Sequence, residues 1–289
     1  MGGMEDFPTG QVIALTPLIR RVLAPNPSAY TYSGTQTYVI GHGRVAVIDP
    51  GPDDAAHVDA LLAAVADETV AYIVCTHTHR DHSPAARALK AATGAEVVGC
   101  AALALDDDGP RADAAFDADY HPDRVLADGE ALSEEGWTLR AVATPGHTSN
   151  HLCLALEEEQ ALFTGDHVMG WSTSVVSPPD GDMAAYMASL ELLLGRPDAV
   201  YYPAHGDPVE NPRRFVRGLL GHRKQREGQI LRLLGRGTHD IPAMVASMYK
   251  GLDTRLHGAA GRSVLAHLID LERRGQVRAH DEHWELLPQ

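Results

Sequence analysis

The stretch CTHTHRDHSPA, Cys75 to Ala85, places three histidines and one aspartate within six positions. His77 and His79 are two residues apart, so in extended backbone their rings project to the same side and can share one metal ion. Asp81 and His82 follow one turn later and can face a second metal ion, about 3.5–4 Å from the first, as in two-metal hydrolases. The stretch therefore predicts half of a two-metal centre.

The residues on either side place this motif on a loop. Residues 70–79, VAYIVCTHTH, are typical of a buried strand that runs directly into the histidines. Residues 83–94, SPAARALKAATG, predict a helix with Ser83 as its N-cap, Pro84 in its first turn and Gly94 at its end. The motif is thus expected on a strand-to-helix loop.

Strand and helix patterns alternate through the first two hundred residues. We expect paired strands at 35–41 and 44–51, a helix at 53–68, and strands at 95–100, 137–147, 151–156, 161–167 and 199–206. Three of these strands end in loops that carry His147, Asp166 and His205. Loops at one edge of layered sheets converge, so these side chains can complete the site. Five imidazoles and two carboxylates suit zinc, although manganese or iron also accepts nitrogen and oxygen donors.

The chain changes character after Pro212. Residues 213–235, 241–251 and 260–275 predict three helices, and 276–288 a two-stranded stretch, which together outline a winged helix. Residues 213–289 hold 14 Lys and Arg against 8 Asp and Glu, a net charge of +6, whereas residues 1–212 carry −21. We therefore expect a catalytic domain over 1–212 and a small winged-helix-like domain over 213–289.

Composition narrows the class of protein further. The 289 residues are 44% hydrophobic, which is enough for a substantial core, yet no apolar run approaches the length of a membrane span. No signal peptide is visible, so we expect a cytoplasmic location and no membrane partner. Cys75, Cys100 and Cys153 lie in apolar surroundings without CxxC spacing and are expected to be small buried residues.

The spaced motifs HTHRDH, Gly-His at 146–147, Gly-Asp at 165–166 and His-Gly at 205–206 together resemble the metallo-β-lactamase superfamily over roughly residues 10–212. The resemblance implies an α+β fold, a four-layered αβ/βα sandwich with two metals, most simply Zn²⁺, in the cleft between its sheets. It assigns the first metal to His77, His79 and His147, the second to Asp81, His82 and His205, and a bridging position to Asp166.

Further segments resemble the β-lactamase-like protein 2 group over nearly the whole chain. They are residues 25–41, 186–194, 202–212 and 222–231, followed by the winged helix. Members of that group are linked with endoribonuclease activity on single-stranded RNA, and relatives in fungal polyketide pathways act as thioesterases. Gln36 stands where the group commonly shows Asn.

The resemblance predicts a dinuclear zinc-dependent hydrolase that uses a metal-bridging hydroxide on an ester, thioester or phosphodiester. Asp81 would be catalytic, orienting the hydroxide and taking its proton. The alternatives are a single-stranded RNA endoribonuclease, a hydrolase with minor activity on β-lactams, and a non-catalytic nucleic-acid-binding protein. The Gly-Asp at 165–166 is typical of glyoxalase II and tRNA-processing nucleases, whereas antibiotic-hydrolysing relatives have a cysteine or no bridging aspartate there, which disfavours β-lactams.

Several residues keep two interpretations. Asp49 either orients a ligand histidine or only forms a turn, and His151 is either a substrate donor or a packed strand residue, while His167 is expected to be incidental. The basic run 222–224 is interpreted as a solvated helical face. The winged helix either presents the mixed-charge segment 261–275 to nucleic acid or acts as a lid or homodimer element, and we favour the lid.

Overall fold

A computed structural model of the protein describes residues 8–103, 116–281 and 283–288. The chain divides into two compact units. The first comprises Met1–Thr144, Asn150–Ser172 and Pro197–Pro212, and the second comprises Pro145–Ser149, Thr173–Arg196 and Arg213–Gln289. The second unit thus contains two segments that precede residue 213. A domain boundary at 212/213 stays a prediction, and residues 1–7 of the expected catalytic domain lie outside the described residues.

The first unit holds a seven-stranded sheet in the order in which its strands occur along the chain. Its strands are β1 (Val12–Ala14), β2 (Ile19–Leu23), β3 (Gln36–Ile40), β4 (Arg44–Ile48), β5 (Thr69–Cys75), β6 (Glu96–Gly99) and β7 (Arg124–Val125). The predicted hairpin is confirmed, because β3 and β4 pair antiparallel with Tyr38 opposite Ile48. From β4 onward the strands run parallel, so a tight turn cannot join neighbouring strands, and a helix lies in each of the β4–β5 and β5–β6 connections.

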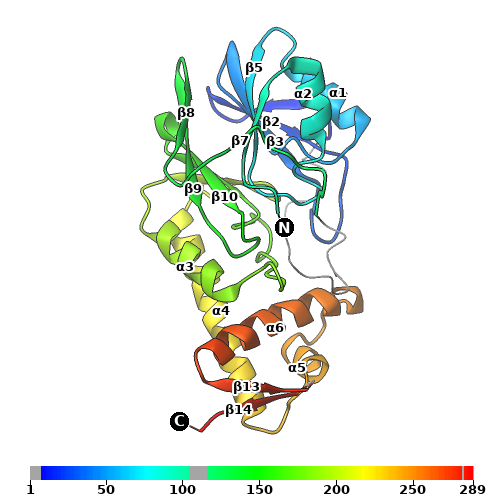
Figure 1. The fold of residues 1–289 in the computed structure, drawn as a ribbon, viewed down its shortest axis with the longest axis vertical. Coiled ribbons are helices and arrows are strands. Elements are labelled where there is room, and N and C mark those ends of the chain that lie inside the picture. Colours follow the sequence, from blue (N-terminus) through cyan, green and yellow to red (C-terminus); the bar gives the residue numbers. More distant parts are fainter. Residues whose placement is uncertain (1–7, 104–115, 282, 289) are drawn as a thin grey trace. The chain divides into compact units, whose positions relative to one another are not determined.

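Helices α1 (Ala55–Ala64) and α2 (Ala85–Thr93) make these connections and lie together on the outer face of this sheet (Figure 1). The side chain of Asp54 caps α1 by accepting from the backbone N–H of His57. The expectation of a Ser83 cap on α2 is wrong: Pro84 is the N-cap, and no side chain caps it. The buried Ser83 hydroxyl instead donates to the carboxylate of Asp117.

A second sheet of five strands completes the first unit, in the order β12-β11-β10-β9-β8. Its strands are β8 (Ala131–Glu134), β9 (Trp137–Ala143), β10 (Leu152–Leu156), β11 (Ala161–Gly165) and β12 (Val200–Pro203). Both sheets contribute to one apolar core. Tyr38 of β3 packs against Phe163 of β11, with ring centroids 5.0 Å apart, and its hydroxyl donates to the Pro203 carbonyl. The two sheets therefore face each other, as the sequence predicted.

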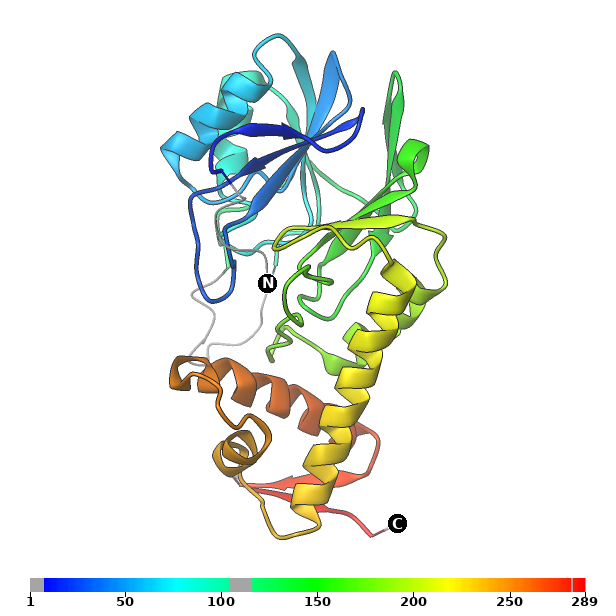
Figure 2. The ribbon, with the colours of Figure 1, turned by 180° about the vertical axis from the view of Figure 1, so that it is seen from behind.

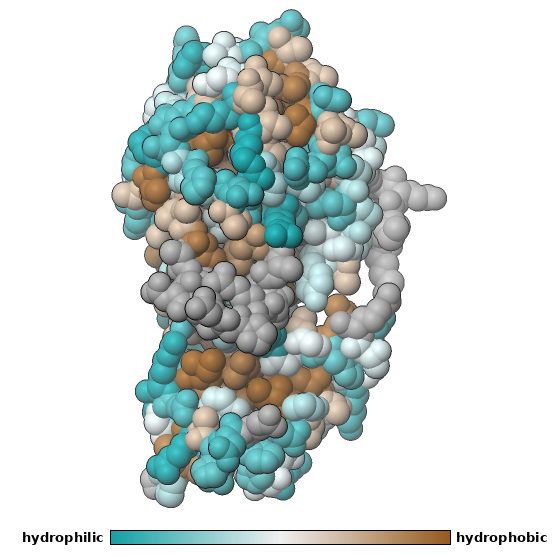
Figure 3. Space-filling model, turned by 45° about the vertical axis from the view of Figure 1, so that its right-hand side comes forward, coloured by the Kyte–Doolittle hydropathy of each residue, from teal (hydrophilic) through white to brown (hydrophobic). Residues whose placement is uncertain are grey.

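The second unit contains α3 (Met183–Leu194) and the C-terminal elements seen clearly in Figure 2. These elements are α4 (Pro212–Leu234), α5 (Ile241–Met248), α6 (His257–Arg273), β13 (Val277–His280) and β14 (His283–Leu286). Their order confirms the expected three helices and hairpin. Residues of α4, α5, α6 and the hairpin, among them Ile230, Met244, Leu268 and Trp284, form one apolar core. Apolar side chains also gather on the surface at the level of α6 (Figure 3).

The exposure of individual side chains contradicts one prediction from the sequence and confirms another. The solvated face proposed for 222–224 is wrong at Arg223, whose side chain is only 3% exposed, although Lys224 is exposed. Cys75, Cys100 and Cys153 are all buried, as predicted. Within the described part of the chain, no helix combines the length and apolarity that a membrane crossing needs.

His267 on α6 makes the stability of the second unit depend on pH. The residue is 3% exposed, and burial, together with the charge of nearby Arg223, lowers its pKa to about 3. An unfolded histidine has a pKa of about 6.5, so between these values the unfolded state binds more protons and stability falls as the pH falls. We predict that His267→Leu removes about 2 kcal/mol of acid destabilisation at pH 5 relative to pH 7.5, measured by urea unfolding of the metal-free protein.

His280→Leu is the control, because His280 is an exposed histidine in the hairpin of the same unit. Its free energy of unfolding should keep the wild-type pH dependence. Equal acid destabilisation in wild type and His267→Leu would contradict a neutral buried imidazole at position 267.

Candidate metal centre

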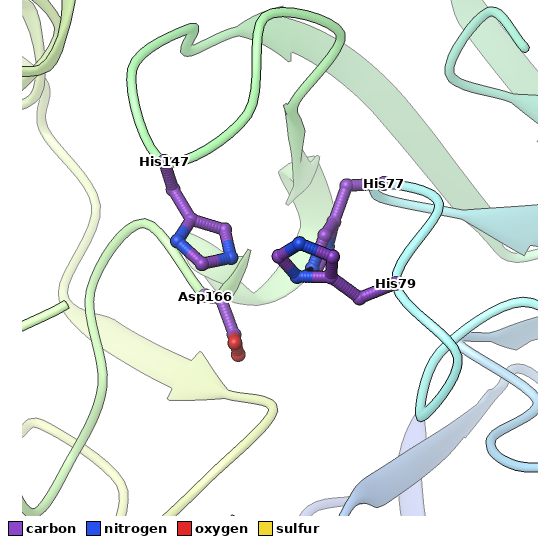
Figure 4. Close-up of side chains that lie close together, drawn as sticks. All are labelled: His77, His79, His147 and Asp166. Carbon is purple, nitrogen blue, oxygen red and sulfur yellow. Dashed lines mark hydrogen bonds between the residues drawn. The ribbon is translucent and has the colours of Figure 1, made fainter. Parts of the chain in front are cut away.

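The seven residues singled out from the sequence come together in two groups. One group contains His77, His79, His147 and Asp166, and the other contains Asp81, His82 and His205. Within each group, every residue offers one ligand atom, and these atoms all lie within 4.8 Å of one another. Figure 4 shows the three imidazole rings of the first group turned toward one another, with Asp166 beside them. The predicted residues are thus all neighbours in space, although they span 129 positions of the chain.

The loop after β5 brings four of these side chains to one place. It begins at Thr76 and folds back on itself, because the backbone N–H groups of His82 and Ser83 both donate to the His79 carbonyl. Asp166 directly follows β11 and His205 follows β12, which runs parallel to β11. Parallel neighbouring strands deliver their C-terminal ends to the same edge, so Asp166 and His205 meet there.

Asp49, at the end of β4, orients the second group. Its carboxylate Oδ2 lies 3.0 Å from Nδ1 of His82 and accepts from the Thr76 hydroxyl, while Oδ1 accepts from the Thr76 backbone N–H. Asp49 also has a positive φ of 47°, a conformation that aspartate tolerates better than most residues. The contact with His82 supports the interpretation that Asp49 orients a histidine ring, whereas residues 49–51 are not part of an assigned turn.

The hydrogen-bond partners decide which ring nitrogen of each histidine carries the proton. Nδ1 of His205 contacts the Gly34 carbonyl at 3.1 Å, and Nδ1 of His147 contacts the Val175 carbonyl at 2.6 Å. A carbonyl can only accept, so both Nδ1 atoms donate, and in a neutral ring each Nε2 keeps a lone pair for a metal. The carboxylate of Asp49 has the same effect on His82.

Thr76 decides in the same way which ring nitrogen of His77, in the first group, carries the proton. Its hydroxyl proton goes to Asp49, so the oxygen must accept from Nδ1 of His77, 3.0 Å away. Nε2 of His77 is therefore the nitrogen available to a metal, and it lies 3.0 Å from Nδ1 of His79. The two nitrogens share a hydrogen bond in the metal-free protein, and a metal bound by both rings would replace the proton between them.

The spacing of the donor atoms in the second group fits a tetrahedral ion. Nε2 of His205 lies 3.2 Å from Oδ2 of Asp81 and 3.2 Å from Oδ1 of Asp166. Nε2 of His82 lies 3.4 Å and 3.6 Å from the same two oxygens. Zinc bonds of 2.0–2.2 Å put neighbouring ligands about 3.3–3.6 Å apart. The buried Nε2 of His82 has no hydrogen-bond partner among the described residues, which suits a ligand atom directed at a cation.

Charge within the second group also suits a cation. Burial opposes the ionisation of Asp81, but the neighbouring charges of His82 and His205 hold its pKa well below the usual range. Burial likewise disfavours charge on His205, yet Asp166 and Asp81 raise its pKa to about 10. The two carboxylates thus stabilise positive charge next to them. In the metal-free protein protonated histidines supply this charge, and a bound metal ion can replace those protons.

The remaining histidines near the site have structural contacts. His151 is 1% exposed; its Nδ1 bonds the Thr144 hydroxyl, and its Nε2 accepts from the backbone N–H of Asp166. It is a packed residue that supports Asp166, so the packed interpretation is correct. His167 is buried and belongs to neither ligand group. Sequence reasoning missed Ser174 and Val175, because a backbone carbonyl acceptor leaves no motif.

Gly146 is required for the loop that carries His147. Its φ is 138°, and a Cβ at this position would lie 2.3 Å from the Tyr186 Cα. Helix α3 therefore approaches this loop too closely for any larger residue. The Gly-His pair at 146–147 thus has a steric cause as well as a chemical one.

Comparisons with known proteins agree with this geometry. Residues 30–205 match the model of the metallo-β-lactamase superfamily, and residues 241–284 match that of the β-lactamase-associated winged helix domain. A β-lactamase-like protein 2 homolog from Drosophila melanogaster is 35% identical, covering 92% of each chain. An atrochrysone carboxyl ACP thioesterase from Aspergillus fumigatus is 33% identical, covering 79% of this chain and 68% of its own.

Solved structures share the fold. A metallo-β-lactamase family protein from Thermus thermophilus superposes with a TM-score of 0.78 at 24% identity, covering 95% of this chain and 100% of its own. A β-lactamase domain protein from Burkholderia ambifaria gives 0.81 at 20% identity, covering 98% and 96%. These likenesses confirm the predicted α+β fold. The chain therefore belongs to the metallo-β-lactamase superfamily of hydrolases and carries a C-terminal winged-helix domain.

Proposed function

We propose that the protein is a dinuclear zinc-dependent hydrolase that cleaves acyl thioesters. The observation that carries the two-metal part is the pair of donor groups, with Oδ1 of Asp166 lying 3.2 Å from His205 and 3.6 Å from His82. Asp166 belongs to the first group and also contacts both histidines of the second, which suits a bridging carboxylate. His77, His79 and His147 would then hold one ion, and Asp81, His82 and His205 the other.

Zinc at these positions would supply Lewis acidity toward the thioester carbonyl and acidify a water molecule. The residues of the chain do the remaining work. Asp81 stays ionised because its pKa is low, and its Oδ2 contacts His82, His205 and the Thr35 hydroxyl. It is thereby positioned to orient the attacking water and to take its proton. Asp49 keeps the His82 ring in the orientation that the metal requires.

The proposed substrate class rests on two kinds of observation. Several fungal relatives are named atrochrysone carboxyl ACP thioesterases, and the 33% identity of two of them extends over most of this chain. The second unit also has a pocket of about 230 Å³ between α6 and the start of α3. Its wall combines apolar side chains, among them Met183, Ala266 and Ile269, with the ion pair of Asp182 and Arg273. The backbone N–H of Asp182 donates to the carbonyl of Gly146, the neighbour of His147. A pocket with apolar and charged walls next to the ligand loop suits an acyl group that carries a polar end.

The contacts of the arginines at the end of α6 argue against nucleic acid. Arg273 is paired with Asp182, and Arg274, directly after the helix, contacts Glu227 and Asp270. Cations that already have acidic partners add little to phosphate binding, which requires uncompensated positive charge. Arg262 donates to the Pro178 carbonyl. These pairings favour the lid over a nucleic-acid-binding role. Single-stranded RNA as substrate, a homodimer and a cytoplasmic location stay predictions.

The experiment that tests this function combines metal analysis with a substrate panel. The panel contains acyl-CoA thioesters, S-lactoylglutathione, single-stranded RNA and a chromogenic β-lactam. We expect two zinc ions per chain and the highest kcat/KM on an acyl thioester, with activity lost on chelation and regained with zinc. Metal-dependent cleavage of RNA without thioesterase activity would overturn the substrate class, and one ion per chain would overturn the dinuclear site.

Asp81→Asn is predicted to lower kcat by about 10²- to 10⁴-fold, because the amide cannot accept the proton of the attacking water. The measurement is steady-state hydrolysis of the best thioester, with zinc content determined in parallel. Full activity in a zinc-loaded Asp81→Asn protein would show that another group takes this proton.

Asp49→Asn is predicted to weaken zinc binding by about 10- to 100-fold, measured by competition with a chromogenic chelator. Asparagine tolerates the positive φ but has one acceptor oxygen, so it cannot serve Thr76 and His82 on both sides of its side chain. Asp123→Asn is the control, because Asp123 pairs with Lys90 at an exposed position. Its zinc affinity should equal that of wild type, and equal affinity in Asp49→Asn would remove Asp49 from the site.

A further inference from the structure

Arg223 is a buried cation on the longest helix, and no role in the proposed mechanism explains it. It is 3% exposed, whereas its neighbour Lys224 is exposed on the same helix. Resting on the proposed function, we propose that Arg223 is a positioning residue that fixes the imidazole of His147 through the Ser174–Val175 backbone. The proposal links α4, the first helix of the winged-helix region, to a ligand of the first metal.

The proposed link from Arg223 to His147, called the relay below, begins with a hydrogen bond from Arg223 to the backbone. Its Nη2 donates to the Ser174 carbonyl, and both groups are buried. The guanidinium also lies over the ring of Tyr186, with its carbon 5.0 Å from the ring centroid. The aromatic face of α3 and the carbonyl together hold the planar guanidinium in one orientation.

The second step runs from this backbone segment to the histidine. Nδ1 of His147 donates to the carbonyl of Val175 at 2.6 Å, and the Ser174 hydroxyl lies 3.3 Å from the same nitrogen. Two consecutive carbonyls therefore accept from different side chains: that of Ser174 from Arg223, and that of Val175 from His147. Because the Val175 carbonyl sets both the orientation and the protonated nitrogen of the ring, its placement decides whether Nε2 faces the metal.

The energetic logic of a buried arginine supports a positioning role. A desolvated guanidinium is unfavourable unless its donors are satisfied, and its Nε has no hydrogen-bond partner among the described residues. An apolar side chain would fill this position at less cost if packing were its only purpose. The guanidinium provides a charged donor to the Ser174 carbonyl, besides its contact with the Tyr186 side chain, and that carbonyl belongs to the segment that orients His147.

Arg226 provides a matched control within the same helix. Its guanidinium lies 4.2 Å from the centroid of the Tyr249 ring, and its Nη1 donates to the Met248 carbonyl at 3.1 Å. It therefore makes the same two kinds of contact as Arg223, but to the end of α5. Loss of Arg226 removes contacts of the same two kinds, at a half-buried position, without touching Ser174 or Val175.

The experiment compares Arg223→Met with Arg226→Met in two measurements. In the first, zinc affinity is determined by chelator competition, and we expect about a tenfold loss for one of the two ions in Arg223→Met and none in Arg226→Met. In the second, ¹⁵N NMR of the metal-free proteins reports the ring nitrogens of His147. Wild type and Arg226→Met should show one tautomer, protonated at Nδ1, and Arg223→Met a mixture.

Arg223→Lys covers the case in which the methionine variant does not fold, because lysine retains the positive charge and much of the aliphatic stem. A single ammonium cannot reproduce the planar fork, so the same changes are expected at reduced size, with about a threefold loss of affinity. Wild-type zinc affinity and a wild-type His147 tautomer in a folded Arg223 variant would overturn the relay. The NMR measurement needs neither metal nor substrate, so its result stands even where wild type fails to hydrolyse thioesters.

Discussion

Three hydrogen bonds converge on the buried carboxylate of Asp49, two from Thr76 and one from His82. A carboxylate can be buried only when it is satisfied in this way. Because it only accepts, it fixes the protonated nitrogen of His82 directly and that of His77 through the Thr76 hydroxyl. One side chain thus decides, in each of the two groups that could hold a metal, which ring nitrogen keeps a lone pair.

The parts of this protein that could be predicted from sequence are those governed by local periodicity and by side-chain chemistry. The alternation of buried strands and amphipathic helices located β3, β4, β5 and the C-terminal helices, because hydrophobic spacing follows directly from which face is buried. The seven His and Asp residues were identified because metal ligands must be particular residue types. Their convergence could be expected because parallel strands such as β11 and β12 end at one edge.

The parts that could not be predicted depend on the backbone or on distant contacts. The acceptor of His147 is a carbonyl of Val175, which any residue type would supply. Ser83 has the sequence signature of a helix cap, but Asp117, 34 residues away, takes its hydroxyl instead. Arg223 lies in a run that reads as solvated, and only the approach of α3 and Ser174 explains its burial. In each case a long-range partner outweighs the local preference.

The charge of the C-terminal region shows why net charge along a sequence is a weak guide to partners. Residues 213–289 carry a charge of +6, which taken alone favours an anionic ligand such as nucleic acid. In the fold, Arg274 is paired with Glu227 and Asp270, and Arg273 with Asp182, a residue from the segment that precedes α3. Arg223 is committed to Ser174. Arg223, Arg273 and Arg274 thus have partners within their own unit, and two of these partners belong to the segments near His147 and the start of α3. A net charge of +6 counts these arginines as if they were available to a ligand, so the charge alone does not indicate nucleic acid as a partner.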